Sequence, residues 1–174
     1  MALVEDKRRM NMNIHEEYKK AGLLHGHYCP GLAIGGRAAL EGRHVLGEGS
    51  LCVLAERSAC WLDGFCLIGA TVGNGKLKIH DTGKPAFGIY NTDTGKALRL
   101  VLKAAPQGLS RDEMTQWLLT APFEEVFSGG TVKRPFPGYK PAGPELSCSA
   151  CGEPVLESKA QLINGQYICP DCCE

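Results

Sequence analysis

The sequence predicts an α+β protein in which helices pack on an antiparallel or mixed sheet, with a small zinc-finger module at the C-terminus. Three observations lead to this prediction. Apolar residues recur at helical spacing before residue 46, short apolar or alternating segments fill residues 51–103, and two Cys-x-x-Cys pairs stand after residue 147. The chain has 174 residues, which suits one domain of ordinary size with a small second unit.

A first helix is expected to begin at Asn13, because Asn13 and Glu16 have the spacing of a capping box. Ile14, Tyr18 and Ala21 then follow at helical spacing, and Gly22 suits the C-terminal stop.

A second helix is predicted from Pro30, a residue favoured at the first helical position, to about Leu46. Gly31, Gly35 and Ala39 recur every four residues along it. This small-residue stripe would allow the close approach of another backbone, either within the fold or across a dimer.

The sheet is expected to begin with the apolar strand 51–55. Residues 59–68 are apolar and long enough for a helix, although a strand is also open there. A glycine-rich turn at 71–75 precedes three strand candidates, and a hairpin connection is expected at 91–95. Those strands are predicted at 76–80, 86–90 and 97–103. A last helix starts at Ser110, where Glu113 completes a capping box.

Composition divides the chain into three parts. Residues 128–147 contain four glycines and four prolines, which is typical of a semi-extended linker. The sequence therefore predicts an α+β core domain over 1–127, a Pro/Gly-rich linker over 128–147 and a four-cysteine zinc finger over 148–174.

The predicted finger carries Cys148, Cys151, Cys169 and Cys172, in the spacing of a four-thiolate zinc site. Zinc prefers tetrahedral thiolate ligands, and a unit of about 27 residues is too small to fold on an apolar core alone, so the metal would supply the folding energy. Two disulfides or free thiols are the alternative interpretation. Cys173 can replace Cys172 as the fourth ligand, and the spacing leaves that choice open.

A second cluster of ligand-type residues lies in the segment HGHYCPG. His25, His27 and Cys29 fall within five residues before a helix, where the helix dipole favours a thiolate. The residue types suit zinc, iron, nickel or copper. Candidate partners are Cys60, Asp63 and Cys66, although Cys60 and Cys66 can equally be buried core residues.

The run HGHYCPGLAIGGRAAL resembles the signature of the FmdE family, which is named after a component of formylmethanofuran dehydrogenase. The match continues through Glu56, Cys60-x-x-Asp63, the turn at 69–75 and the segment 81–84, and it covers most of residues 25–90. The resemblance implies an α+β core that dimerises, with a treble-clef-like zinc finger appended. It also implies a shared pocket lined by His25, His27 and Cys29, with Cys60 and Asp63 nearby.

One departure from the family pattern bears on the site. Many relatives carry a cysteine at the position of Ala70, so Cys66 would have to replace that ligand here. In the dehydrogenase the molybdenum or tungsten pterin belongs to a different polypeptide, and nothing in this chain resembles a pterin site. The resemblance therefore implies a link to methanogenesis-related one-carbon metabolism without naming a reaction.

The composition narrows the function classes. Nineteen basic residues balance nineteen acidic ones, so nucleic-acid binding is not expected. The absence of a signal-like or membrane-spanning apolar run, together with nine cysteines, favours a cytoplasmic protein. Three functions stay open: a metal-dependent accessory protein or enzyme with a core pocket, an interaction module that docks a partner through the finger, and a thiol redox protein using Cys29.

Overall fold

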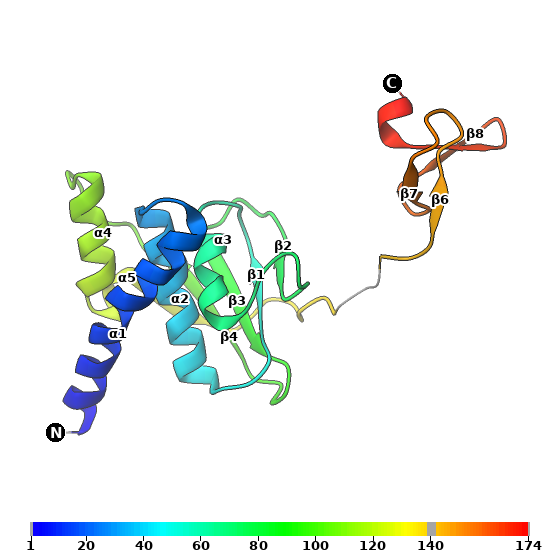
Figure 1. The fold of residues 1–174 in the computed structure, drawn as a ribbon. Helices are drawn as coiled ribbons and strands as arrows, with labels where there is room; N and C mark the ends of the chain where they lie inside the picture. The colour runs from blue at the N-terminus through cyan, green and yellow to red at the C-terminus, as the bar shows by residue number, and fades with distance from the viewer. Residues whose placement is uncertain (1, 139–141, 174) are drawn as a thin grey trace. The chain divides into compact units, whose positions relative to one another are not determined.

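The computed structural model describes residues 2–138 and 142–173, with side chains from Ile14 onward. The chain divides into two compact units, Met1–Pro137 and Gly138–Glu174. Figure 1 shows the first as helices packed against a sheet and the second as short hairpins. The α+β class predicted from the sequence is confirmed.

The first unit contains a mixed five-stranded sheet in the order β2-β1-β3-β4-β5, in which β2 runs parallel to β1 and the other neighbours are antiparallel. The strands are β1 (Leu51–Ala55), β2 (Leu77–Ile79), β3 (Ala86–Asn91), β4 (Ala97–Leu102) and β5 (Phe127–Gly130). The helices are α1 (Ala2–His25), α2 (Pro30–Leu46), α3 (Trp61–Gly64), the 3₁₀ turn η1 (Phe65–Ile68), α4 (Arg111–Thr120) and α5 (Phe123–Val126).

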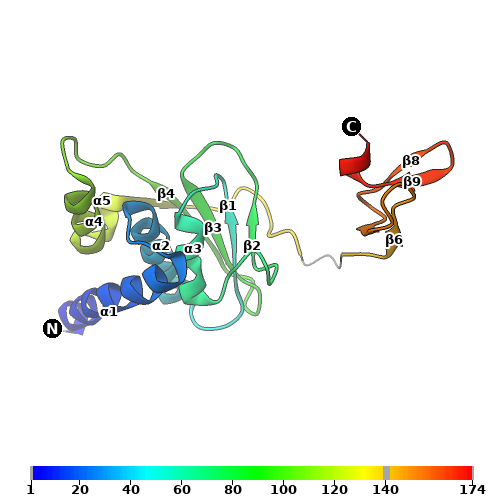
Figure 2. The ribbon, with the colours of Figure 1, turned by 45° about the horizontal axis from the view of Figure 1, so that its top comes forward.

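The two faces of this sheet are covered differently. On one face Val53, Phe87 and Ile89 join a large apolar core with residues of α1, α2, α3 and α4, and both ribbon views place the helices there (Figures 1 and 2). On the other face Tyr90 packs in a small separate cluster, which only Val132 and Phe136 extend. The core of this unit therefore lies between the helices and one sheet face.

Helices α2 and α3 approach so closely that only glycine fits between them. A Cβ atom on Gly35 would overlap the backbone of Trp61, and one on Gly64 would overlap the backbone of Gly35 and Gly36. A Cβ on Gly31 would lie 2.9 Å from Cβ of Cys60. The small-residue stripe of α2 is thus used within the fold, where it sets α3 directly against α2.

Aromatic packing fixes α3 and η1 on the sheet. The rings of Trp61 and Phe65 both meet Phe87 of β3 edge to face, with centroids 5.6 and 5.1 Å apart. The indole nitrogen of Trp61 donates to the carbonyl oxygen of Arg57 at 2.9 Å, and the Arg57 guanidinium lies over the indole ring. This short helix is therefore held from both sides, by glycine contacts and by the aromatic cluster.

The structure corrects the predicted limits of the first helix. Helix α1 begins before Asn13 and continues past Gly22 to His25, so neither residue caps it. Gly26 ends the helix instead, with φ at +83° and its N–H bonded to the carbonyl of Gly22. None of the described helices combines the length and apolar character needed to cross a lipid bilayer.

The predicted linker also differs from the structure. Residues 127–130 form β5, the edge strand paired with β4, and Phe136 packs on the sheet. Glycines at 129 and 130 suggested a linker, but an edge strand tolerates them because it is paired on one side only. Residues 139–141 of the predicted linker lie outside the described residues, and β6 (Glu145–Ser147) already belongs to the second unit.

The second unit consists of two hairpins and a final turn. Strand β6 pairs with β7 (Pro154–Leu156), β8 (Gln161–Ile163) pairs with β9 (Gln166–Ile168), and the 3₁₀ turn η2 (Pro170–Cys172) follows. Asn164 and Gly165 both have positive φ angles, of 50° and 79°, as a type I′ hairpin turn requires.

We predict opposite effects for the same added methyl group at two neighbouring glycines. Gly35→Ala should lower the free energy of unfolding of the first unit by about 1–3 kcal/mol, because the methyl group meets the Trp61 backbone. Gly36→Ala is the matched control. Its Cβ would meet only Leu67, at 3.4 Å, and alanine is the better helix former by about 1 kcal/mol.

The measurement is urea unfolding followed by the fluorescence of Trp61 and Trp117, which both lie in the first unit. Equal stabilities for the two variants would contradict the close packing of α2 on α3.

Candidate functional site

The short connection between α1 and α2 carries three of the predicted site residues. Gly26 turns the chain after His25, and Cys29 caps α2, with its sulfur accepting the N–H of Leu32 at 3.3 Å. The hydroxyl of Tyr18 donates to the carbonyl of Cys29 at 3.2 Å. The position of the Cys29 thiol is therefore set by helix capping and by a buried tyrosine on α1.

Four side chains from this connection and from α3 converge. The ligand atoms of His25, His27, Cys29 and Cys60 all lie within 4.8 Å of one another. Nε2 of His25 is 3.8 Å from the sulfur of Cys29. Tetrahedral zinc with ordinary bond lengths separates a sulfur from a nitrogen ligand by roughly 3.6 Å. These four residues thus have the spacing and chemistry of a two-thiolate, two-imidazole metal site.

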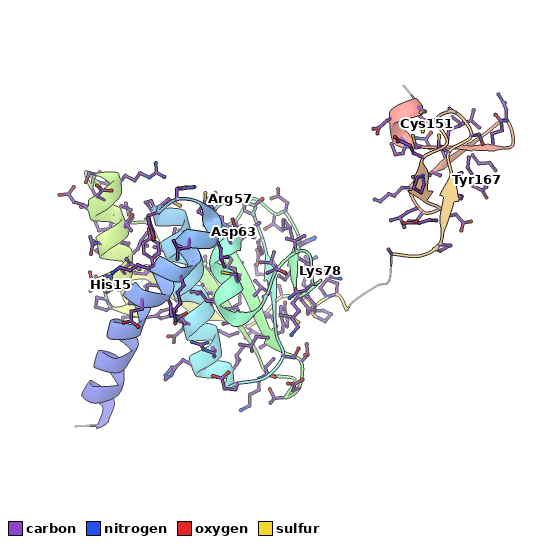
Figure 3. The ribbon with its side chains drawn as sticks, viewed as in Figure 1. His15, Arg57, Asp63, Lys78, Cys151 and Tyr167 are labelled. Atoms are coloured by element: carbon purple, nitrogen blue, oxygen red, sulfur yellow. The ribbon has the colours of Figure 1, made fainter. Side chains whose placement is uncertain are left out.

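Asp63 orients one of the imidazoles. Its carboxylate lies 2.6 Å from Nδ1 of His25, while the His25 side chain is 8% exposed and that of Asp63 is 61% exposed. Figure 3 labels Asp63 on α3. A hydrogen bond from Nδ1 to the carboxylate leaves the lone pair of Nε2 facing Cys29, which is the usual arrangement around a metal-binding histidine.

The thiols of this cluster oppose each other's ionisation. Burial raises the pKa of Cys60, and the neighbouring Cys29 raises it further. Two adjacent thiolates are unfavourable without a compensating charge, and a bound cation would supply that charge. The donor set therefore fits a metal ion, which would bind with release of protons.

Cys66 lies outside this cluster, although the sequence allowed it as a ligand. It lines a neighbouring cavity of about 320 Å³, together with Asp63, Ala70 and apolar residues that include Leu24 and Val72. Burial raises the pKa of its thiol, and the nearby Asp63 carboxylate adds to this effect. Asp63 therefore stands between the His/Cys cluster and an apolar cavity large enough for a small molecule.

The second unit holds a separate group of four thiols. Sγ of Cys148, Cys151, Cys169 and Cys172 lie within 4.8 Å of one another, and Cys151 and Cys169 are 4.0 Å apart. Backbone N–H groups of Cys169 and Cys151 lower the pKa of Cys148 to about 6, while adjacent thiols raise the pKa of Cys172 to about 12. The group therefore has one thiolate ready for a metal and others that a metal must deprotonate.

Cys173, the alternative ligand, points elsewhere. Its sulfur contacts the carbonyl oxygen of Ile168 at 3.8 Å and is not part of the four-thiol group. The geometry therefore assigns the fourth position to Cys172.

The sequence singled out every residue of both groups, but not what brings Cys60 to Cys29. Gly64 makes the closest backbone contact between α2 and α3, and Tyr18 holds the Cys29 carbonyl. The glycine stripe on α2 was the available signal for the first contact. No pattern in the sequence indicates the second.

Comparisons with known proteins agree with this fold. The family model described as "FmdE, Molybdenum formylmethanofuran dehydrogenase operon" matches residues 24–128. Among solved structures, the chain is similar to an FmdE-like protein of tungsten formylmethanofuran dehydrogenase from Syntrophus aciditrophicus. The sequence identity is 22%, the TM-score is 0.60, and the match covers 92% of this chain and 91% of that chain. No curated protein matches.

We predict that Cys169→Ser releases the metal of the second unit and unfolds residues 148–174, because three thiolates and no core cannot hold so small a unit. The first unit should keep its unfolding transition, followed by tryptophan fluorescence. Cys173→Ser is the matched control and should retain the metal. Loss of metal in the control, or joint melting of both units in Cys169→Ser, would contradict the assignment.

Proposed function

This chain belongs to the FmdE family, and on that premise we propose that it is a metal-dependent protein with two ions per chain. A transition-metal ion is held in the core by His25, His27, Cys29 and Cys60. A structural zinc ion is held in the second unit by Cys148, Cys151, Cys169 and Cys172. The observation that carries the proposal is the convergence of two imidazoles and two thiols within 4.8 Å in the core.

The two sites differ in accessibility. Four thiolates close a structural zinc site, whereas a catalytic site keeps a position for water or substrate. In the core Cys29 is buried and His25 is nearly so, but His27 is exposed. Exchange of the His27 ligand for a small molecule would open the coordination sphere from the solvent side. The core site therefore suits a working ion, and the second unit a structural one.

The apolar cavity beside Asp63 supplies a place for that small molecule. It is lined by Leu24, Leu62 and Val72 and has about 320 Å³. A bound transition-metal ion would act there as a Lewis acid. The chain's own residues hold the ligand against an apolar wall, and Asp63 fixes the orientation of His25.

We place this activity in one-carbon metabolism of the formylmethanofuran type. The support is family membership and the likeness to a solved structure that is itself an FmdE-like protein. An accessory role beside a dehydrogenase, or a metal-dependent reaction of its own, both fit the core site. The described cysteines are all free thiols, in keeping with a cytoplasmic location.

A thiol redox function is the second candidate, because Cys29 and Cys60 are adjacent. The raised pKa of Cys60 opposes it, since a reactive thiol needs a lowered pKa. The redox function becomes preferable only if the core binds no metal.

A protein partner for the finger is supported by a separate observation. On the β8–β9 hairpin the exposed fractions of Leu162, Ile163 and Tyr167 are 63%, 41% and 38%. Figure 3 labels Tyr167 on this unit, together with Cys151. An exposed apolar hairpin of this kind is typical of a docking surface.

A homodimer completes the proposal. Leu23 and Leu24 at the end of α1 have exposed fractions of 79% and 78%, and Val72 beside the same cavity is 64% exposed. Burial of this apolar surface in a second copy would stabilise a dimer. Light scattering of the full chain at micromolar concentration should give twice the mass of one chain, with Leu23→Ser/Leu24→Ser giving the single mass. A monomeric parent would remove the dimer from the proposal.

We predict two metal ions per chain in protein purified without chelator, measured by elemental analysis. Cys29→Ala should lose only the core ion. Asp63→Asn should keep its fold but weaken core metal binding about 10–100-fold in a chelator competition, because the partner of His25 is altered. Cys52→Ala is the control, since Cys52 is buried on the opposite sheet face and should leave both ions in place.

One outcome would remove the core site from the proposal. If the parent holds one ion per chain, and Cys169→Ser removes it even after reconstitution with metal, the core site does not exist.

A further inference from the structure

A second cavity lies on the sheet face that the helices leave uncovered. It measures about 80 Å³ and is bordered by β1, β3 and β4 and by the segment 132–134. Leu54, Gly88 and Arg99 occupy matching positions on neighbouring strands, and Gly88 contributes no side chain between the other two. The strands thus leave a hollow with room for several water molecules, which is also the size of a single oxyanion.

The segment 132–134 is fixed over this hollow. The hydroxyl of Tyr90 donates to the carbonyl of Arg134 at 2.8 Å, and the Tyr90 ring meets that of Phe136 with centroids 5.6 Å apart. Val132 and Phe136 extend the apolar cluster of this face. The backbone that carries Lys133 and Arg134 is therefore held against the sheet.

The only carboxylate that lines the cavity among the described residues is already neutralised. Glu56 accepts two hydrogen bonds from Arg99, from Nε at 2.6 Å and from Nη2 at 2.9 Å, and a third from the hydroxyl of Thr82 at 3.1 Å. These bonds, chiefly those from Arg99, hold the pKa of Glu56 below its usual value. Nη1 of Arg99 donates to no other group in the described part of the chain.

Three further cations line the same cavity, and they come from two segments: Lys84 after β2, and Lys133 and Arg134 from the segment over the hollow. Within residues 2–138 and 142–173, no carboxylate lies within 4.0 Å of any of the three. His80 also borders the cavity. Positive charge without a counter-charge is thus gathered around one small hollow.

We propose that this hollow binds the phosphate group of a small anionic ligand. Lysine offers a point charge and arginine a planar pair of donors, and together they are the usual partners of phosphate. A dianion suits a set of three uncompensated cations better than a carboxylate does. The cavity holds one phosphate group, so the rest of any ligand would extend into solvent. The site is on the opposite sheet face from the His/Cys cluster and is independent of the function proposed above.

The test is a calorimetric titration of the full chain with inorganic phosphate, at constant ionic strength set with chloride. The parent should bind one phosphate per chain, and Lys133→Gln/Arg134→Gln should bind about tenfold more weakly or less. Lys19→Gln/Lys96→Gln removes the same charge from exposed positions away from the cavity and should bind as the parent does. Circular dichroism would verify that each variant is folded.

Further arms separate this site from its alternatives. Cys29→Ala should bind phosphate normally, because the anion does not depend on the core metal site. Methyl phosphate binding as tightly as inorganic phosphate would identify a phosphorylated metabolite as the ligand, and weaker binding would identify free phosphate. The proposal is overturned if the parent shows no saturable binding, if acetate binds as tightly as phosphate, or if the lysine/arginine variant binds as the parent does.

Discussion

The contact between α2 and α3 is the constraint on which the rest of the first unit depends. Gly35, Gly36 and Gly64 let two helix backbones meet without side chains between them. Cys60 directly precedes α3 and Cys29 directly precedes α2, so this contact brings the two thiols together. A helix separation of the usual 8–10 Å would leave them apart. The ligand cluster is therefore a consequence of helix packing.

The same contact explains why a helix as short as α3 is stable. Four residues of helix have no independent stability in water, because nucleation is unfavourable. Here Trp61 and Phe65 anchor the segment on Phe87, while Gly64 seats it on α2. Asp63 then reaches His25 from a backbone that cannot shift easily. Rigid placement of this kind preorganises a binding site before any ligand arrives.

Much of this arrangement could be predicted from the sequence, since local signals dominate it. Pro30 marks the start of α2, the residues 51–55 form β1 as expected, and Ser110 with Glu113 makes the predicted capping box. The prediction was wrong where tertiary contacts overrule composition. Residues 127–130 form an edge strand although their composition indicates a linker, and α1 runs through Asn13 and Gly22. The separation of Cys66 from Cys60 also depends on η1, whose geometry no spacing rule indicates.

The central claim is that packing of α2 on α3 builds a core metal site with two thiolate and two imidazole ligands. X-ray absorption spectroscopy at the metal edge tests it most directly, on full-length Cys169→Ser reconstituted with zinc so that the core ion dominates. The account predicts a first shell of two sulfur atoms and two nitrogen atoms, at distances of about 2.3 and 2.0–2.1 Å. A shell of sulfur alone, or of nitrogen and oxygen without sulfur, would contradict it.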